Sequence, residues 1–126
     1  GPGEGLTTVI WTIDIPGWAP VPLNQLLTSH WAKAARLKKS DRDTVGIACL
    51  AYRVPEAKGK RKVSVLVVWP KGQRSCDKDA IFKSLLDSLV HAGALKNDSA
   101  AWCVLGPVEY AKGETLRTIV TIQDVS

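Results

Sequence analysis

The 126-residue sequence has few residues of the kinds that build disulfide frameworks or soft-metal sites. Its three cysteines, Cys49, Cys76 and Cys103, are odd in number and widely spaced, so the sequence indicates neither a disulfide framework nor a CxxC metal site. The two histidines, His30 and His91, are isolated, and isolated histidines are more often structural than catalytic. We therefore expect reduced thiols and a cytoplasmic protein.

Long apolar runs are also missing. No stretch approaches the roughly 20 apolar residues of a membrane-spanning helix, and the N-terminus lacks the charged start and apolar run of a signal peptide. The chain has no P-loop, no Rossmann glycine pattern and no Ser-His-Asp arrangement. We therefore expect neither secretion nor membrane insertion, and nothing in the sequence supports nucleotide binding or acyl transfer.

The composition predicts one compact domain with a basic surface. Hydrophobic residues make up 45% of the chain, enough for a real core, and residues 6–126 are expected to form a single domain. Residues 1–5, which begin Gly1-Pro2, are interpreted as a tag remnant and excluded from the fold. The net charge of +5 suits a polyanionic partner but is common in proteins without one.

Four segments rich in strand-forming residues predict a sheet. The run V-S-V-L-V-V-W at 63–69 is the most β-prone and is expected to be a central strand. Gly106-Pro107 interrupts the third strand. The expected strands span residues 6–15, 63–69, 101–110 and 115–123.

Two helical patterns lie among these strands. The first covers 28–52 and is either one long helix or is broken near Ser40-Asp41; the proline-rich segment 16–23 before it is expected to be a loop. A flexible basic loop is expected at 55–62. The second helix runs from about Asp77 to Ala92. Together these elements predict an α+β (mixed α/β) fold with about four strands and two main helices packed on the sheet.

The second helix organises the chain. Asp77 stands at its N-cap position and Gly93 at its C-cap, and an apolar stripe on one face packs it on the core. The stripe consists of Ile81, Phe82, Leu85, Leu86 and Leu89.

Three aspartates around this helix are candidates for chemistry. Asp77 and Asp79 form a D-x-D pair, and Asp98 lies in the following loop; carboxylates of this kind are the ligands that Mg²⁺ prefers. Lys83, one turn after Asp79, could contact a phosphate. The alternative is an ordinary N-cap, an ordinary i,i+4 ion pair between Asp79 and Lys83, and an ordinary turn residue. Asp87, one turn further, is expected to form a supporting or solvated pair.

The helix and the loop after it resemble a known family. The residues read D77-K-D79-A-I-F-K83-S-L-L-D87-S-L, then H-A-G-A-L-K-N97-D98-S, and resemble the signature of RusA-like Holliday-junction resolvases, small endodeoxyribonucleases of phage and bacteria. The opening strand followed by a proline-rich loop and Asn24, and the closing strand at 118–122, extend the resemblance over nearly the whole chain. Only the central motif is specific.

The resemblance implies a Mg²⁺-dependent nuclease, with Mn²⁺ as a substitute, that resolves four-way DNA junctions by paired symmetric nicks as a homodimer. It assigns metal binding to Asp77, Asp79 and Asp98 and phosphate assistance to Lys83. Two positions depart from the family pattern: Ala80 stands where the family has Asn, and Asn97 where it often has Asp. Ala80 cannot hydrogen-bond a neighbouring ligand.

Binding to such a substrate would depend on phosphate contacts rather than base edges. The candidate cations lie on the first helix, in the basic loop and beside the acidic pair: Lys33, Arg36, Lys38, Lys39, Lys58, Lys60, Arg61, Lys62, Lys71 and Arg74. Two alternatives stay open. One is a nuclease of flaps, forks or other branched DNA, and the other is a catalytically silent DNA-binding protein of the same fold.

Overall fold

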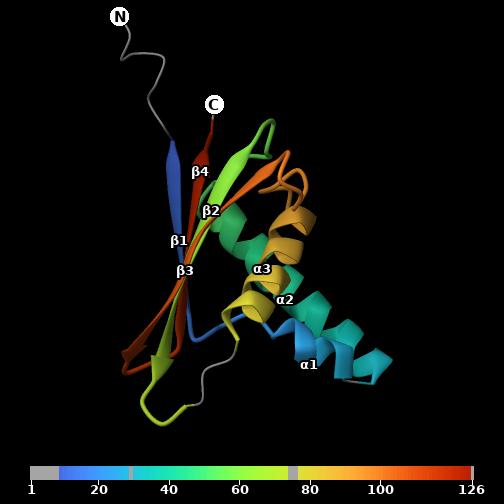
Figure 1. Ribbon diagram of the computed structural model, residues 1–126, viewed down its shortest axis with the longest axis vertical. Helices are drawn as coiled ribbons and strands as arrows, with labels where there is room; N and C mark the ends of the chain where they lie inside the picture. The colour runs from blue at the N-terminus through green and yellow to red at the C-terminus, as the bar shows by residue number, and fades with distance from the viewer. Residues whose placement is uncertain (1–8, 29, 74–76, 126) are drawn as a thin grey trace, which may run out of the picture.

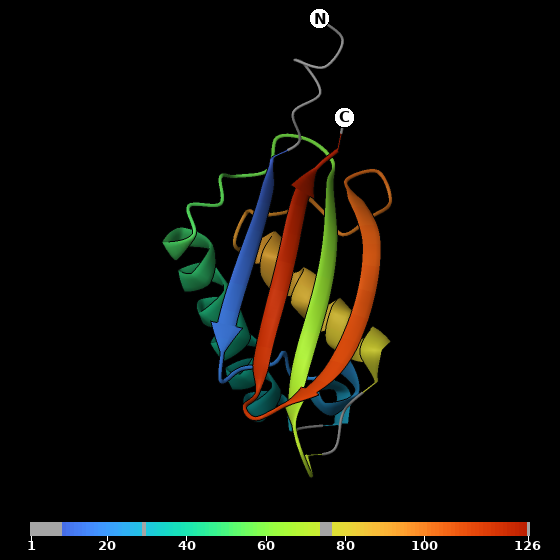
Figure 2. The same cartoon turned by 90° about the vertical axis from the view of Figure 1, so that its left-hand side faces the viewer.

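The computed structural model describes residues 9–28, 30–73 and 77–125, and it contains one four-stranded sheet. The strands lie in the order β1 (Ile10–Pro16), β4 (Arg117–Asp124), β2 (Arg61–Pro70), β3 (Cys103–Gly113). β2 and β3 are parallel, and the other neighbours are antiparallel. The helices α1 (Leu23–Thr28), α2 (Trp31–Ala51) and α3 (Lys78–His91) cover one face of the sheet (Figure 1). Figure 2 shows the opposite face, which none of these helices covers. The predicted α+β fold with two main helices is confirmed.

β2 is the central strand that its composition predicts. It pairs with β4 on one side and β3 on the other, and its residues alternate strictly between buried and half-buried. Val63, Val65 and Val67 are at most 3% exposed and face the helices. Because side chains on a strand alternate between its two faces, this parity also decides where Arg61 points.

The predicted break in the third strand is a bulge. β3 continues through Gly106-Pro107, but its register with β2 shifts between Val63 and Val65. A Cβ atom at residue 106 would lie 2.8 Å from the Val63 carbonyl oxygen, and it would also overlap Ser64 Oγ. Glycine is therefore required here because the two backbones approach closely.

α3 begins and ends where the sequence predicts. Asp77 is its N-cap and accepts a hydrogen bond from the Asp79 backbone N–H at 2.9 Å, and Gly93 follows the helix with φ of 82°. The apolar stripe is buried, with Ile81, Leu85 and Leu89 at 0% exposure. α3 is thus fixed against the sheet, and its polar edge is left to solvent.

The first helical region confirms one of the two predicted alternatives, the long unbroken helix, and adds a short helix before it. α2 is continuous through Ser40 and Asp41. Asp41 is buried, and its carboxylate accepts hydrogen bonds from Trp18 Nε1 at 3.2 Å and Val21 N at 2.9 Å. The bonds tie the proline-rich loop to α2 without breaking the helix. The expected loop also ends in a short helix, α1, which the sequence reading missed.

The missed helix has a local cause. The Pro22 carbonyl accepts a hydrogen bond from Gln25 N at 3.0 Å, so the last proline of the loop opens a helical turn. Proline is tolerated there because the first turn of a helix needs no N–H from it. Residues 1–5 and 6–8, assigned above to a tag remnant and to the start of strand one, lie outside the described residues.

Candidate functional site

The three candidate aspartates lie at the two ends of α3. Asp77 and Asp79 stand where the chain enters the helix after β2, and Asp98 lies in the loop that leads from the helix to β3. Since β2 and β3 are parallel, the connection that leaves one strand and the connection that enters the next are at opposite ends of the sheet (Figure 1). Asp79 and His91, near the two ends of α3, are about 18 Å apart along its axis, at roughly 1.5 Å per residue.

This separation means that one chain does not bring the three carboxylates together. Within residues 9–28, 30–73 and 77–125, no three His, Cys, Asp or Glu side chains gather closely enough to hold a metal ion. A helix standing between two motif residues keeps them apart, however close they are in the sequence. The single-chain metal site is therefore not formed.

The N-terminal end of α3 carries exposed charge with little compensation. Asp77 and Asp79 are both exposed, and the only hydrogen bond between them is the N-cap bond. Lys83 is exposed, and in the described part of the chain no ion pair joins it to Asp79, so the ordinary i,i+4 pair does not form. Lys71 is exposed in the turn after β2. Two carboxylates and the lysines Lys71, Lys78 and Lys83 are thus exposed at this end, and Lys78 Nζ lies 5.3 Å from the centroid of the Tyr110 ring.

The loop after α3 offers one available carboxylate, that of Asp98. Asn97 Oδ1 accepts a hydrogen bond from Ser99 N at 2.9 Å, so Asn97 stabilises the turn itself. Asp98 is exposed, and burial together with the nearby Asp98 charge raises the pKa of the Cys103 thiol. Among the described residues, Asp98 makes no ion pair.

The two described cysteines are unsuited to chemistry. Cys49 and Cys103 are free and buried, and burial raises the pKa of Cys49 to about 11. A thiol with a raised pKa stays protonated and is neither a good nucleophile nor a good metal ligand. Cys76 lies outside the described residues.

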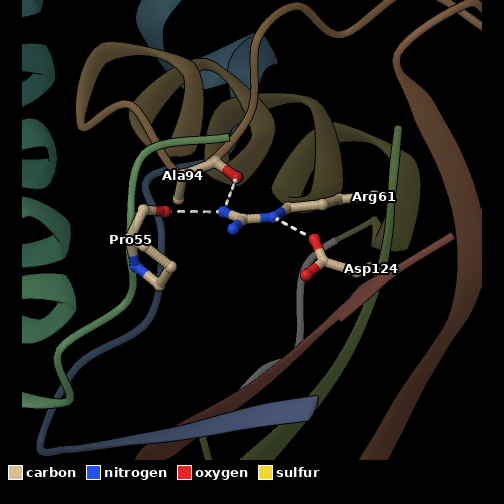
Figure 3. A network of polar contacts seen from close by, with 4 residues as sticks. All are labelled: Pro55, Arg61, Ala94 and Asp124. Atoms are coloured by element: carbon tan, nitrogen blue, oxygen red, sulfur yellow. Dashed lines mark hydrogen bonds and ion pairs between the residues drawn. The ribbon is translucent and has the colours of Figure 1, made fainter. Parts of the chain in front are cut away.

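Arg61 was predicted to contact DNA, and the structure assigns it elsewhere. The residue is 2% exposed, and its guanidinium donates to Asp124 Oδ1 at 2.8 Å, to the Pro55 carbonyl at 2.8 Å and to the Ala94 carbonyl at 2.9 Å (Figure 3). The guanidinium carbon also lies 4.7 Å from the centroid of the Trp11 ring. Arg61 ties β4 and two loops to the start of β2 and has no surface to offer a phosphate. The alternation of β2 carried this signal, because residue 61 has the same parity as buried Val63.

The other basic candidates remain on the surface. Lys39 is exposed and pairs with Asp43 at 2.8 Å, and Lys62 is half-buried on β2. Arg74 lies outside the described residues. The remaining exposed candidates, which make no ion pair in the described chain, are Lys33, Arg36 and Lys38 on α2, Lys58 and Lys60 before β2, and Lys71 after it.

An ion pair joins α2 and α3, and the sequence pointed to only one of its two residues. Arg42 on α2 donates to Asp87 on α3 through Nε at 3.1 Å and Nη2 at 3.3 Å, which makes Asp87 a supporting residue, as expected, but with a partner from another helix. Arg42 was overlooked as a cation, although it stands one helical turn after the predicted candidate Lys38 and so shares its face.

Comparison with protein-family models finds no match to this chain, and comparison with curated proteins finds none. α2, the longest helix of the described chain, carries too many charges to cross a bilayer, and no other helix there combines the necessary length and apolarity.

Proposed function

We propose that the protein is a Mg²⁺-dependent, structure-specific endonuclease that acts on branched DNA, preferably four-way junctions, as a homodimer. The proposal is supported by the sequence motif around α3 together with one structural observation. The motif carboxylates Asp77, Asp79 and Asp98 are all exposed and free of ion pairs in the described chain. Their carboxylates are therefore open to a cation from solvent.

The donor set of one chain falls short of what the ion requires. Asp77 and Asp79 supply two neighbouring carboxylates, and the third is at the far end of α3. A two-fold axis perpendicular to α3 reverses the direction of that helix in the second copy. It would then bring the Asp98 end of one copy to the Asp77 and Asp79 end of the other. We therefore propose that each metal site is completed by two chains, with Mn²⁺ as a substitute for Mg²⁺.

The dimer also suits the substrate. A four-way junction has approximate two-fold symmetry, so two identical sites related by a two-fold axis would act on opposed strands. Basic residues on one face of α2 and beside the acidic ends would hold phosphates, with Lys83 assisting at the reacting one.

Mixing two inactive variants tests the shared site. Asp79→Asn and Asp98→Asn each remove one ligand, and each variant alone should bind a synthetic four-way junction without cleaving it. In a mixed dimer, one site receives both substitutions and the other receives neither. Refolding the two variants together should therefore restore cleavage, as single nicks instead of paired ones.

The alternatives have distinct results. If every site were built within one chain, each chain of the mixed dimer would carry a defect, and cleavage would stay absent. An excess of the double variant Asp79→Asn/Asp98→Asn mixed with the unmodified protein is the matched control. Its mixed dimers keep no intact shared site, so cleavage should fall to that of the few unmodified homodimers that remain. Equal cleavage of a fork and a junction at the same protein concentration would instead favour a general branched-DNA nuclease.

A catalytically silent DNA-binding protein is the second candidate. It is favoured by the absence of any three-carboxylate cluster in the described part of one chain, and by Ala80 and Asn97 in the motif. This function predicts tight junction binding by the unmodified protein with no product in either Mg²⁺ or Mn²⁺. Product formation with either ion rules it out.

A further inference from the structure

α2 and α3 form an open hollow of about 410 Å³ on the helical side of the molecule, a volume in the range of ligand pockets. Five of its lining residues come from α2 and one from α3: Ala35, Lys38, Lys39, Arg42, Asp43 and His91. We call this hollow the α2–α3 groove. Three of these side chains carry a positive charge against one negative charge, on Asp43, and His91 adds a further nitrogen donor, so the lining has an excess of groups that can bind an anion.

Arg42 is held in place within the groove. The two bonds to Asp87 use Nε and one N–H of Nη2, while a guanidinium carries five N–H donors. Nη1 makes no hydrogen bond among the described residues. The ion pair with Asp87 therefore fixes the plane of the guanidinium and leaves N–H groups for a ligand, which reduces the ordering cost of binding.

Lys38 supplies uncompensated charge beside Arg42. The two residues are one helical turn apart on α2 and share a face, and Lys38 is exposed with no ion pair in the described chain. Lys39, in contrast, has its charge matched by Asp43 at 2.8 Å. Ala35 lines the groove one turn earlier, and its small side chain leaves room for a ligand.

A second hollow, near the start of β2, does not have this character. It is lined by Lys58 and Lys60 but also by Glu56 and Asp124, and its arginine, Arg61, is already engaged by three protein oxygens. Opposite charges line both hollows, since Asp43 lines the α2–α3 groove and Asp87 pairs with Arg42. The groove differs because its arginine keeps N–H groups that make no hydrogen bond among the described residues, beside the exposed Lys38. The α2–α3 groove is the better anion site of the two.

We infer that the α2–α3 groove binds a phosphate of the DNA backbone, with Lys38 and Arg42 as the principal contacts and His91 as a further donor. This inference rests on the proposed action on DNA and narrows the predicted DNA contacts on α2 to one face. Lys33 lies on the opposite side of the helix from Arg42, at roughly 100° of rotation per residue, and makes no such contact. The groove is shallow and open at the surface, as a polymer backbone requires.

The test measures junction binding by fluorescence anisotropy over a range of KCl concentrations, for matched variants. Lys38→Gln should raise the Kd about fivefold near 0.1 M salt and lower the slope of log Kd against log salt by about 1. Ala35→Leu, which fills the groove and keeps every charge, should also weaken binding. Lys33→Gln removes the same charge from the same helix and should change neither the Kd beyond about twofold nor the slope. Thermal unfolding confirms that each variant is folded.

Each other result overturns the inference. Equal effects of Lys33→Gln and Lys38→Gln would mean diffuse attraction by α2, without a groove site. An unchanged Kd for both Lys38→Gln and Ala35→Leu would exclude phosphate binding in the α2–α3 groove. It would not contradict the proposed function. Failure of the unmodified protein to bind any junction would reject both together. Inorganic phosphate at constant ionic strength should compete no better than chloride; stronger competition would assign the groove to a free phosphate compound.

Discussion

The two ends of the β2–α3–β3 unit use charge in opposite ways. At the start of β2, the Arg61 guanidinium is buried and satisfied by three protein oxygens, so its charge serves the fold. At the N-terminus of α3, Asp77 and Asp79 are exposed and make one hydrogen bond between them. Both regions looked alike in the sequence, as clusters of charged residues. What separates them is burial, which turns a charge into a structural connector in one place and leaves it available to a ligand in the other.

The largest effect is expected from removing the buried charge. Arg61→Met should lower the free energy of unfolding by about 3 kcal/mol, because it leaves the Pro55 and Ala94 carbonyls without their donor and Asp124 without its partner. Urea denaturation measures this change. Lys60→Met, the same kind of change at the exposed neighbour, should cost no more than about 0.5 kcal/mol. Similar losses from the two variants would contradict the contrast between the two ends.

A smaller effect is expected at the exposed end. Asp77→Ala removes the N-cap of α3 and should cost about 1 kcal/mol, whereas Asp77→Asn keeps a capping oxygen and should cost much less. Both variants should lose Mg²⁺-dependent cleavage, because both lack the carboxylate. Denaturation curves and junction cleavage assays, run on the same preparations, separate the structural role from the proposed metal role. Retained cleavage in Asp77→Asn would remove Asp77 from the ligand set.

The smallest effect is expected at Asp41, a buried acid that makes no ion pair within residues 9–28, 30–73 and 77–125. Burial raises the pKa of Asp41, against hydrogen bonds from Val21, Trp18 and Ser84 that lower it. A folded pKa above the unfolded value of about 3.9 means that the folded state binds more protons between the two values. The contribution of Asp41 to stability therefore falls as pH rises through that window and is constant above it.

The measurement compares two proteins. Urea denaturation from pH 3.5 upward gives the free energy of unfolding of the unmodified protein and of Asp41→Asn. The first value minus the second should decrease as pH rises, since the other titrating groups are common to both proteins. A difference that increases with pH would mean that the hydrogen bonds to the carboxylate outweigh its burial.

Most of the secondary structure followed from local patterns. The apolar stripe and caps located α3, and the β-branched run located β2 as the central strand, because these signals depend on neighbours within a few residues. α1 was missed because the prolines before it dominate the local pattern. The bulge at Gly106 was seen as a break, since a sequence shows that pairing is disturbed and not that the strand resumes in a new register.

The candidate site could be predicted only in its parts. The sequence identified Asp77, Asp79 and Asp98 as carboxylates suited to a hard cation, and the parallel crossover then placed Asp98 at the other end of α3. Arg42 and His91 come from different helices, so no local pattern could join them into the α2–α3 groove.

By itself, then, the amino-acid sequence determined which segments are helical or extended, where α3 is capped and which residue types are present for chemistry, because those properties arise from short-range interactions. The tertiary structure alone decided the strand order, the burial of Arg61 and the meeting of α2 and α3 at the α2–α3 groove. Those depend on which distant segments pack together, and packing selects among the many arrangements that the same local elements allow.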